Sequence, residues 1–274
     1  MLKTRVITAL LLLLVFLTAL FWLPSGAWAL FAGLLVIPAA WEWAKLIKFN
    51  NGVCVLYVLA VTAICAVLFS QIHPAAHSGL LEFSIYGGAS LFWMLVVPQW
   101  LWRTRLPREP WLAALTGLVV LVPTWMALVQ LHKLGPAALL LLMAVAWISD
   151  SAAYFAGRSF GRHKLAPSIS PGKTWEGVAG AFLAVSLYAV LWGAVWHAYF
   201  PKAFQSMRFG AFGMLLFLWL LAAIGIYGDL FESALKRQAG VKDSGVLLPG
   251  HGGVLDRIDA LTSVLPVAAL VYLI

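Results

Sequence analysis

Nine apolar segments, separated by short polar stretches, make up most of the chain. A membrane-spanning helix needs about 20 predominantly apolar residues to cross a hydrocarbon core of roughly 30 Å, and each segment approaches that length. The pattern predicts an all-α polytopic integral membrane protein with about nine transmembrane helices. The segments are residues 6–23, 26–44, 53–70, 84–102, 111–131, 136–156, 175–199, 210–232 and 253–273.

The composition excludes a soluble protein. Of the 274 residues, 63% are hydrophobic and 10% are charged, and the mean hydropathy is +0.96, whereas soluble domains carry about 25% charged residues. The two cysteines, Cys54 and Cys65, lie eleven positions apart in one apolar segment. That spacing is about 16 Å along a helix, too far for a disulfide, so we expect both to be packing residues.

Lysine and arginine fall almost entirely on one side of this arrangement. Cytoplasmic loops carry an excess of these residues. With the N-terminus inside, 15 of the 18 lie inside, and Lys133, Lys202 and Arg208 lie outside. We therefore expect a cytoplasmic N-terminus and a periplasmic C-terminus. The net charge of +8 then faces anionic lipid or a polyanion at one membrane surface, and we expect no nucleic acid partner.

A cleaved signal peptide is the alternative interpretation of the first segment. Lys3 and Arg5 precede it, and Ala27-Trp28-Ala29 resembles a cleavage site. Its apolar run is longer than the roughly 7–15 residues that are usual for the apolar region of a signal peptide, and another apolar segment follows at once. We therefore expect a retained helix.

Acidic residues are concentrated in the second half of the chain. A carboxylate inside a bilayer costs at least about 2.5 kcal/mol unless it is paired, hydrated or bound to metal. Glu42, Glu82 and Glu109 lie near the ends of early segments, and we assign them no special role. We therefore expect one domain, 1–274, with 1–135 mainly a scaffold and 136–274 forming a polar site. The other seven acidic residues are Asp150, Glu176, Asp229, Glu232, Asp243, Asp256 and Asp259.

One group of polar residues surrounds the sixth predicted span and the loop after it. Asp150, Tyr154 and Arg158 recur every four residues, so they share one helix face. The stretch Ser170-Pro-Gly-Lys173-Thr174 then precedes a new helix, whose N-terminus with a nearby lysine can bind an anion. Lys173 is either a membrane-surface cation or a direct phosphate ligand. A nucleotide-binding P-loop is not expected, because Pro167 replaces the required glycine and we expect no strand before it.

A second group lies between Asp229 and Asp259. Asp256 and Asp259 are three residues apart, so a helix would point both carboxylates to one side. A hard divalent ion such as Mg²⁺ would remove their repulsion, and Asp229 is the natural third ligand. Arg257 could instead neutralise the pair as a salt bridge. Zinc is not expected, because only oxygen-type partners surround His251 and no pair of cysteines lies nearby.

Glycines bracket His251 in the same group. Gly250, Gly252 and Gly253 let the backbone approach a ligand closely and present N–H groups to phosphate. We expect His251 to bind phosphate by hydrogen bonding or to orient this loop.

These residues resemble the CDP-diacylglycerol synthases, also called phosphatidate cytidylyltransferases. The family shares two regions: a signature, whose matching residues are given below, and a second region, which the stretch from Asp150 to Gly177 resembles. The two regions together cover about 60 residues. The family's signature is matched by Ser233, Leu235, Lys236-Arg237, Lys242-Asp243, Gly245, Leu248-Pro249, His251-Gly252-Gly253 and Asp256-Arg257-Ile258-Asp259.

The resemblance implies that phosphatidic acid and CTP become CDP-diacylglycerol and pyrophosphate in a cell inner membrane, at a site facing the cytoplasm. It implies Mg²⁺, with a second cation as a further option, held by Asp229, Asp256 and Asp259. It also implies a homodimer. The catalytic set would be these three residues with Lys236, Arg237 and Arg257. The substrate-binding set would be Ser170, Lys173, Thr174, Ser233, Lys242, Asp243, His251, Gly252 and Gly253.

Two other functions remain open. Another membrane enzyme that uses CTP or a lipid, such as a lipid kinase, could present similar charges. A transporter could use buried carboxylates to conduct cations or protons. A transporter needs polar access from both membrane faces, however, and the acidic residues here favour one.

Overall fold

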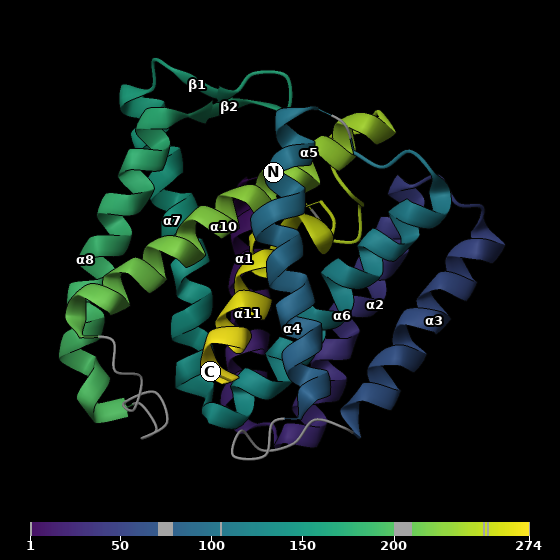
Figure 1. Ribbon diagram of the computed structural model, residues 1–274, viewed down its shortest axis with the longest axis horizontal. Coiled ribbons are helices and arrows are strands. Elements are labelled where there is room, and N and C mark those ends of the chain that lie inside the picture. Colours follow the sequence, from purple (N-terminus) through teal and green to yellow (C-terminus); the bar gives the residue numbers. More distant parts are fainter. Residues whose placement is uncertain are drawn as a thin grey trace.

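The computed structural model of the protein is a bundle of long helices (Figure 1). It describes residues 2–70, 79–104, 106–199, 210–248, 250 and 252–273, with only the backbone for 2–6, 193–199 and 211. The helices are α1 (Leu2–Trp22), α2 (Ser25–Leu46), α3 (Asn51–Phe69), α4 (Leu80–Leu91), η2 (Phe92–Val96), α5 (Val97–Trp102), α6 (Pro110–Leu134), α7 (Pro136–Phe160), α8 (Trp175–Tyr199), α10 (Ala211–Ala239) and α11 (Leu255–Leu273).

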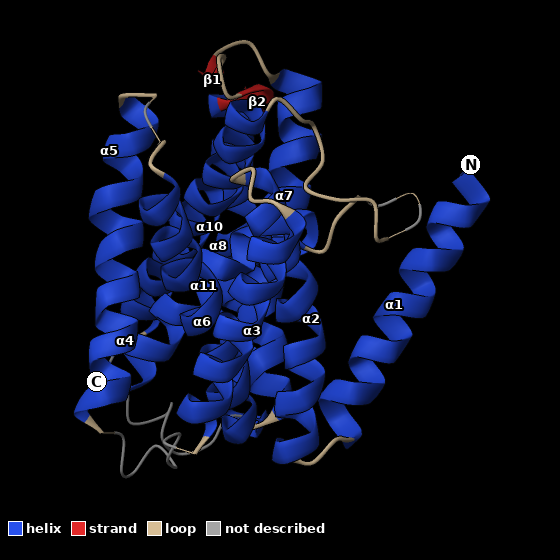
Figure 2. Cartoon of the chain, turned by 90° about the vertical axis from the view of Figure 1, so that its right-hand side faces the viewer, coloured by secondary structure: helices blue, strands red, loops and turns tan. Residues whose placement is uncertain are grey.

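Each predicted span corresponds to a helix or, for 84–102, to the continuous run α4, η2 and α5. In the described part of the chain, seven helices are long and apolar enough to cross a membrane, and Ile7–Trp22 is a shorter apolar helix. The protein is therefore an α-helical polytopic membrane protein. Its N-terminus lies toward the end of the bundle that carries the strands β1 and β2, and its C-terminus lies toward the opposite end (Figure 2).

The prediction for the span at 210–232 ends too early. α10 continues to Ala239 because its charged last turns contact α11 and the turn between β1 and β2 instead of starting a loop. Gly240 ends the helix with a φ of 81°, a left-handed conformation that glycine adopts at helix C-termini without steric cost. Lys236 and Arg237 are thereby helical residues with fixed directions.

The expectation of a purely helical fold misses one hairpin. β1 (Lys164–Ala166) pairs antiparallel with β2 (Ser170–Thr174), and Lys164 lies opposite Thr174. The expectation that no strand precedes Pro167 was therefore wrong, because β1 ends at Ala166. Gly172-Lys173-Thr174 lie within β2 rather than in a loop that leads from a strand to a helix. The hairpin is too short to have a hydrophobic period, and it closes one end of α7 and α8 (Figure 1).

Glycines allow close approaches between neighbouring helices. A side chain at Gly177 or Gly180 of α8 would clash with Ala153 or Ala156 of α7. A side chain at Gly228 of α10 would clash with the backbone of α11. These glycines bring α8 close to α7 and α10 close to α11.

The core of the bundle centres on α6, where 72% of an 18-residue apolar stretch is buried inside the protein. α1 lies at the side, and its N-terminal end leans away from the bundle (Figure 2). Leu10 to Val15 of α1 are exposed, as expected for side chains that face lipid.

An aromatic cluster surrounds Phe231 of α10. Its ring centroid lies 5.5 Å from that of Trp93, 6.0 Å from Phe92, 6.1 Å from Trp43 and 6.3 Å from Trp100. These rings come from α2, η2 and α5, and aromatic pairs at such separations attract one another. The cluster therefore holds α10 at a defined rotation, with Asp229 and Glu232 on its other faces.

Candidate active site

A polar cavity of about 500 Å³ opens between α7, the β hairpin and α10. Asp150, Tyr154 and Arg158 line it from α7, which confirms that they share one face, and Nη1 of Arg158 donates to the Tyr154 hydroxyl at 3.0 Å. Further lining residues are Lys164, Ser170, Lys173 and Asp229. The cavity thus combines carboxylates with cations and hydroxyl groups.

Lys173 of β2 reaches across this cavity to α10. Its Nζ lies 2.5 Å from Oδ2 of Asp229, and both side chains are partly buried. The hydroxyl of Ser233 donates to Oδ1 of Asp229 at 3.3 Å. Asp150 and Asp259 are near enough to interact electrostatically with Asp229 and with Lys173. The ammonium of Lys173 therefore pairs directly with Asp229, and its charge also acts on Asp150 and Asp259.

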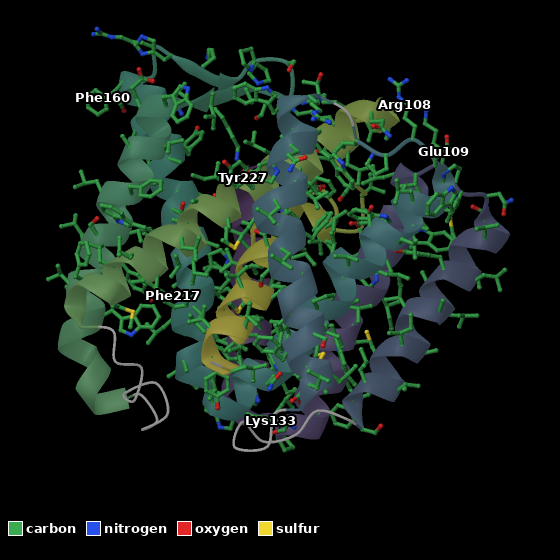
Figure 3. All side chains as sticks on the ribbon, viewed as in Figure 1. Arg108, Glu109, Lys133, Phe160, Phe217 and Tyr227 are labelled. Atoms are coloured by element: carbon green, nitrogen blue, oxygen red, sulfur yellow. The ribbon has the colours of Figure 1, made fainter. Side chains whose placement is uncertain are left out.

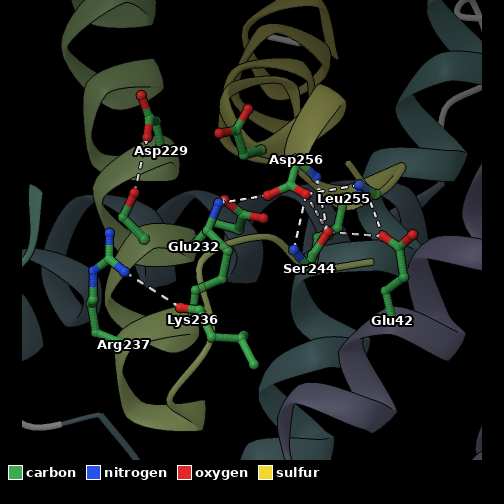
Figure 4. Close-up of polar contacts among 12 residues, drawn as sticks. Glu42, Asp229, Glu232, Lys236, Arg237, Ser244, Leu255 and Asp256 are labelled. Carbon is green, nitrogen blue, oxygen red and sulfur yellow. Dashed lines mark hydrogen bonds and ion pairs between the residues drawn. The ribbon is translucent and has the colours of Figure 1, made fainter. Parts of the chain in front are cut away.

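A second charged group lies one helical turn further along α10. Nζ of Lys236 is 2.5 Å from Oε2 of Glu232 and 2.6 Å from Oδ1 of Asp256. Figure 4 shows Asp256 between Lys236 and Ser244. Glu232 is also close enough to Asp259 for their charges to interact. The two charged groups therefore form one continuous polar region between α10 and α11.

The donor set of this region suits a hard divalent cation. It contains five carboxylates, which Mg²⁺ prefers as ligands: Asp150, Asp229, Glu232, Asp256 and Asp259. Three of them, Asp229, Glu232 and Asp256, pair directly with Lys173 or Lys236. Within the described residues, however, no three His, Cys, Asp or Glu side chains lie close enough to one another to hold a metal ion. Asp229, Asp256 and Asp259 are thus not gathered into one ligand set, and their joint role stays a prediction.

The loop between α10 and α11 forms a second opening of about 350 Å³. Lys242, Asp243, Gly252 and Arg257 line it, and the first two and Arg257 are exposed. Within the described residues no ion pair joins Arg257 to Asp256 or Asp259. The predicted site residue His251 lies outside the described residues.

Several predicted site residues have a structural contact in addition. Thr174 is buried, and its hydroxyl accepts a hydrogen bond from Gly177 N at 3.1 Å, which caps α8. Nε of Arg237 donates to the Ile169 carbonyl at 3.4 Å and holds the hairpin against α10. Gly253 N donates to Oδ2 of Asp256 at 2.8 Å. The expected roles of these residues toward substrate stay predictions.

Sequence reasoning missed Glu42. We expected no special role for it, yet it is 5% exposed and its carboxylate binds the start of α11, 213 positions along the chain. The position follows Trp41 inside a predicted span, and a carboxylate there needs a partner. That cost was the available signal, but it identifies no partner.

The fold and this region define a polytopic membrane protein with a charge-rich polar site at the hairpin end of the bundle. The model of the cytidylyltransferase family matches residues 3–274. The chain belongs to this family.

Curated relatives agree with this assignment. A phosphatidate cytidylyltransferase of Pseudomonas aeruginosa is 39% identical over 273 residues, covering 98% of this chain and 96% of the relative. One of Haemophilus influenzae is 32% identical, with 99% of each chain covered. One of Thermotoga maritima is 46% identical over 138 residues, half of each chain.

Proposed function

We propose that this protein transfers the cytidylyl group of CTP to phosphatidic acid and releases pyrophosphate. The observation that carries the proposal is the gathering of the signature residues Lys236 and Asp256, with Asp229 and Lys173, into one polar region of a chain that belongs to the cytidylyltransferase family. The phosphatidate cytidylyltransferases of Pseudomonas aeruginosa and Haemophilus influenzae match this chain along nearly their whole length.

The reaction we propose is an in-line displacement. A phosphate oxygen of phosphatidic acid forms a bond to the α-phosphorus of CTP. The bond from that phosphorus to the oxygen that bridges the α- and β-phosphorus breaks, and the electron pair of this bond leaves with pyrophosphate. A phosphate monoester is already largely ionised near neutral pH, so no general base is needed. Such chemistry depends on positioning and on neutralising charge.

The cations of the site would supply that neutralisation. Lys173 and Lys236 are paired with carboxylates, and each could exchange a carboxylate for a phosphate oxygen when substrate enters. Arg257 and Lys242 stand exposed at the neighbouring opening, where they could meet the phosphates from the other side. Arg237, which lies next to Lys236, would complete this group.

Asp229, Asp256 and Asp259 are the residues we propose to hold Mg²⁺, with Asp150 beside them. A bound Mg²⁺ would supply Lewis-acid stabilisation of the charge that develops on the phosphates. In this proposal Ser233 keeps the carboxylate of Asp229 in place through its 3.3 Å hydrogen bond. Ser170, at the edge of the cavity, would bind substrate.

We further propose nine membrane crossings, with the hairpin end in the cytoplasm of a bacterial inner membrane. Support comes from the cations: Lys133, which the sequence predicts to lie outside, is at the opposite end of the bundle from Arg108, which it predicts to lie inside (Figure 3). CTP is cytosolic, so the cavity would open toward it while the acyl chains stay in the bilayer. A homodimer is expected from the resemblance alone.

Two radioactive labels test the transfer against its nearest rival. Purified protein is given CTP labelled at the α- or the γ-phosphorus, together with phosphatidic acid or, in a parallel assay, with diacylglycerol, whose free hydroxyl a lipid kinase would phosphorylate. We expect α-label in the lipid product and γ-label in pyrophosphate, and no lipid label when EDTA is added. Label in lipid from γ-labelled CTP alone would identify a lipid kinase instead. Label in lipid from neither would exclude both enzymes.

A further inference from the structure

The N-terminus of α11 is buried inside the protein. Val254 is 5% exposed and Leu255 is 1% exposed. The first N–H groups of a helix have no acceptor within the helix, and burial without a partner is costly. Glu42 of α2 provides both acceptors, because Oε1 accepts from Val254 N at 3.0 Å and Oε2 accepts from Leu255 N at 2.8 Å.

The same carboxylate reaches Asp256 through one serine. The Ser244 hydroxyl lies 3.0 Å from Oε2 of Glu42 and 2.9 Å from Oδ2 of Asp256. Its single proton can be donated to one of them at a time, while Asp256 N donates back to the Ser244 hydroxyl at 3.3 Å. Ser244 is therefore a direct link between the two carboxylates (Figure 4).

The loop before α11 holds one of the two carboxylate oxygens of Asp256. Oδ2 accepts from Ser244 N at 2.9 Å and from Gly253 N at 2.8 Å, in addition to its contact with the Ser244 hydroxyl. Oδ1 contacts Lys236 of α10. These donors fix the rotation of the carboxyl group, so that Oδ1 is directed into the polar region between α10 and α11.

Two glycines of the loop pack directly against the Glu42 carboxylate. A side chain at Gly245 or Gly253 would clash with the Glu42 carboxylate. Two glycines of the loop are therefore required where the loop passes Glu42. The loop that carries Ser244 and Gly253 therefore lies in direct contact with the carboxylate.

We propose that Glu42 is a positioning residue for Asp256. It acts from the N-terminal half of the chain by fixing the start of α11 and, through Ser244, the carboxylate that is directed toward Lys236. The inference rests on the proposed function, in which Asp256 contributes to binding Mg²⁺ with CTP. Residues that orient metal ligands commonly change metal affinity or activity by about 10- to 100-fold when mutated.

Glu42→Gln is the first test variant. It preserves size, but its NH₂ group cannot accept from Val254 N or Leu255 N. At saturating CTP and phosphatidic acid, we expect the Mg²⁺ concentration for half-maximal activity to rise about 10-fold or more. We also expect the affinity of the protein for Mn²⁺ in the presence of CTP to fall by a similar factor. Electron paramagnetic resonance of the free Mn²⁺ ion measures this affinity.

Ser244→Ala separates positioning from capping. It removes the link to Asp256 but leaves Glu42 free to accept from Val254 N and Leu255 N. We expect it to reproduce most of the loss of Mn²⁺ affinity with little loss of thermal stability. The double variant with Glu42→Gln should cost less than the product of the two single effects, because both break one chain of contacts.

Glu82→Gln is the matched control. Glu82 is also buried, and it accepts from Gly79 N at 2.8 Å at the start of α4. We expect unchanged Mn²⁺ affinity, whatever its effect on stability. If Glu42→Gln and Ser244→Ala lower only the thermal stability and leave the metal dependence of the folded protein at the wild-type value, Glu42 is a helix cap and the proposal is wrong.

The two proposals can fail separately. A wild-type protein that transfers no α-label to lipid would contradict the proposed function. The comparison of Mn²⁺ affinities between wild type and Glu42→Gln would still test the positioning role, since it needs no turnover.

Discussion

Nζ of Lys236 lies 2.6 Å from Oδ1 of Asp256, so a cation near the end of α10 directly contacts a carboxylate in the first turn of α11. Removing one partner of a buried ion pair leaves the other charge uncompensated. The pair therefore makes both residues sensitive to substitution, and it places a cation and a metal-type ligand within reach of the same phosphate group.

Asp256→Asn should abolish most activity while the protein stays folded. The amide oxygen can still accept from Ser244 N and Gly253 N, but an NH₂ group then faces Lys236. We expect a rate loss of about 10²-fold or more, as for other single groups that stabilise transition-state charge, measured as transfer of α-label to lipid. Glu109→Gln, at an N-cap position without a side-chain hydrogen bond, serves as the control and should be neutral. Normal turnover by Asp256→Asn would remove its carboxylate from the mechanism.

Lys173→Met should weaken CTP binding. The ammonium forms an ion pair with Asp229, and its charge also acts on Asp150 and Asp259. Charged hydrogen bonds contribute about 1.5–3 kcal/mol, which corresponds to about 10- to 100-fold in KM for CTP. Lys48→Met, which removes an exposed lysine between α2 and α3, should leave KM unchanged. An equal effect of both variants would mean that Lys173 acts only as a surface charge.

Thr174→Ala should reduce stability more than it affects substrate binding. The buried hydroxyl caps α8 through Gly177 N, and losing an N-cap costs about 1 kcal/mol. Thr174→Ser should restore the midpoint of thermal unfolding in detergent. Unchanged unfolding of Thr174→Ala together with a higher KM for CTP would instead assign the hydroxyl to the substrate.

Gly253→Ala should be strongly disruptive. Its new methyl group would clash with Ser244 and Glu42, and overpacking of this kind costs about 1–3 kcal/mol. Gly26→Ala is the comparison, because nothing lies within 4 Å of the position where its Cβ would be. Equal thermal stability of the two variants would mean that the loop relaxes freely around Glu42.

Membrane orientation can be checked with cysteines at Lys133 and Arg108. In spheroplasts, a membrane-impermeant maleimide should label Lys133→Cys at once and Arg108→Cys only after permeabilisation. The native Cys54 and Cys65 are buried, so their background should be small. The reverse labelling would place the polar cavity on the periplasmic side.

The helices were predictable because a helix that crosses lipid must satisfy its own backbone and present apolar side chains over its whole length. The breaks between spans fell near the observed ends for the same reason. The end of α10 was not predictable, since charged residues such as Lys236 indicate a loop until their buried partners on α11 are known. The hairpin around Lys173 was missed because strands of three and five residues carry no usable period.

The site was predictable as a set of residues but not as a set of contacts. Charge in an apolar chain indicates where chemistry lies, and that reasoning found Lys173, Asp229, Lys236 and Asp256. It could not reveal which cation meets which carboxylate, because pairing depends on how α10 and α11 face each other. It also could not connect Glu42 to Leu255, since no local pattern encodes a bond between such distant positions.

The rings around Phe231 have a consequence for protein engineering. They come from α2, η2 and α5, whereas Asp229 and Glu232 lie two and one positions from Phe231 on α10. A chimera that joins the first half of one relative to the second half of another would combine unmatched rings, and a misfit would turn α10 about its axis. Functional hybrids should therefore exchange Trp43, Trp93 and Trp100 together with Phe231 as one unit.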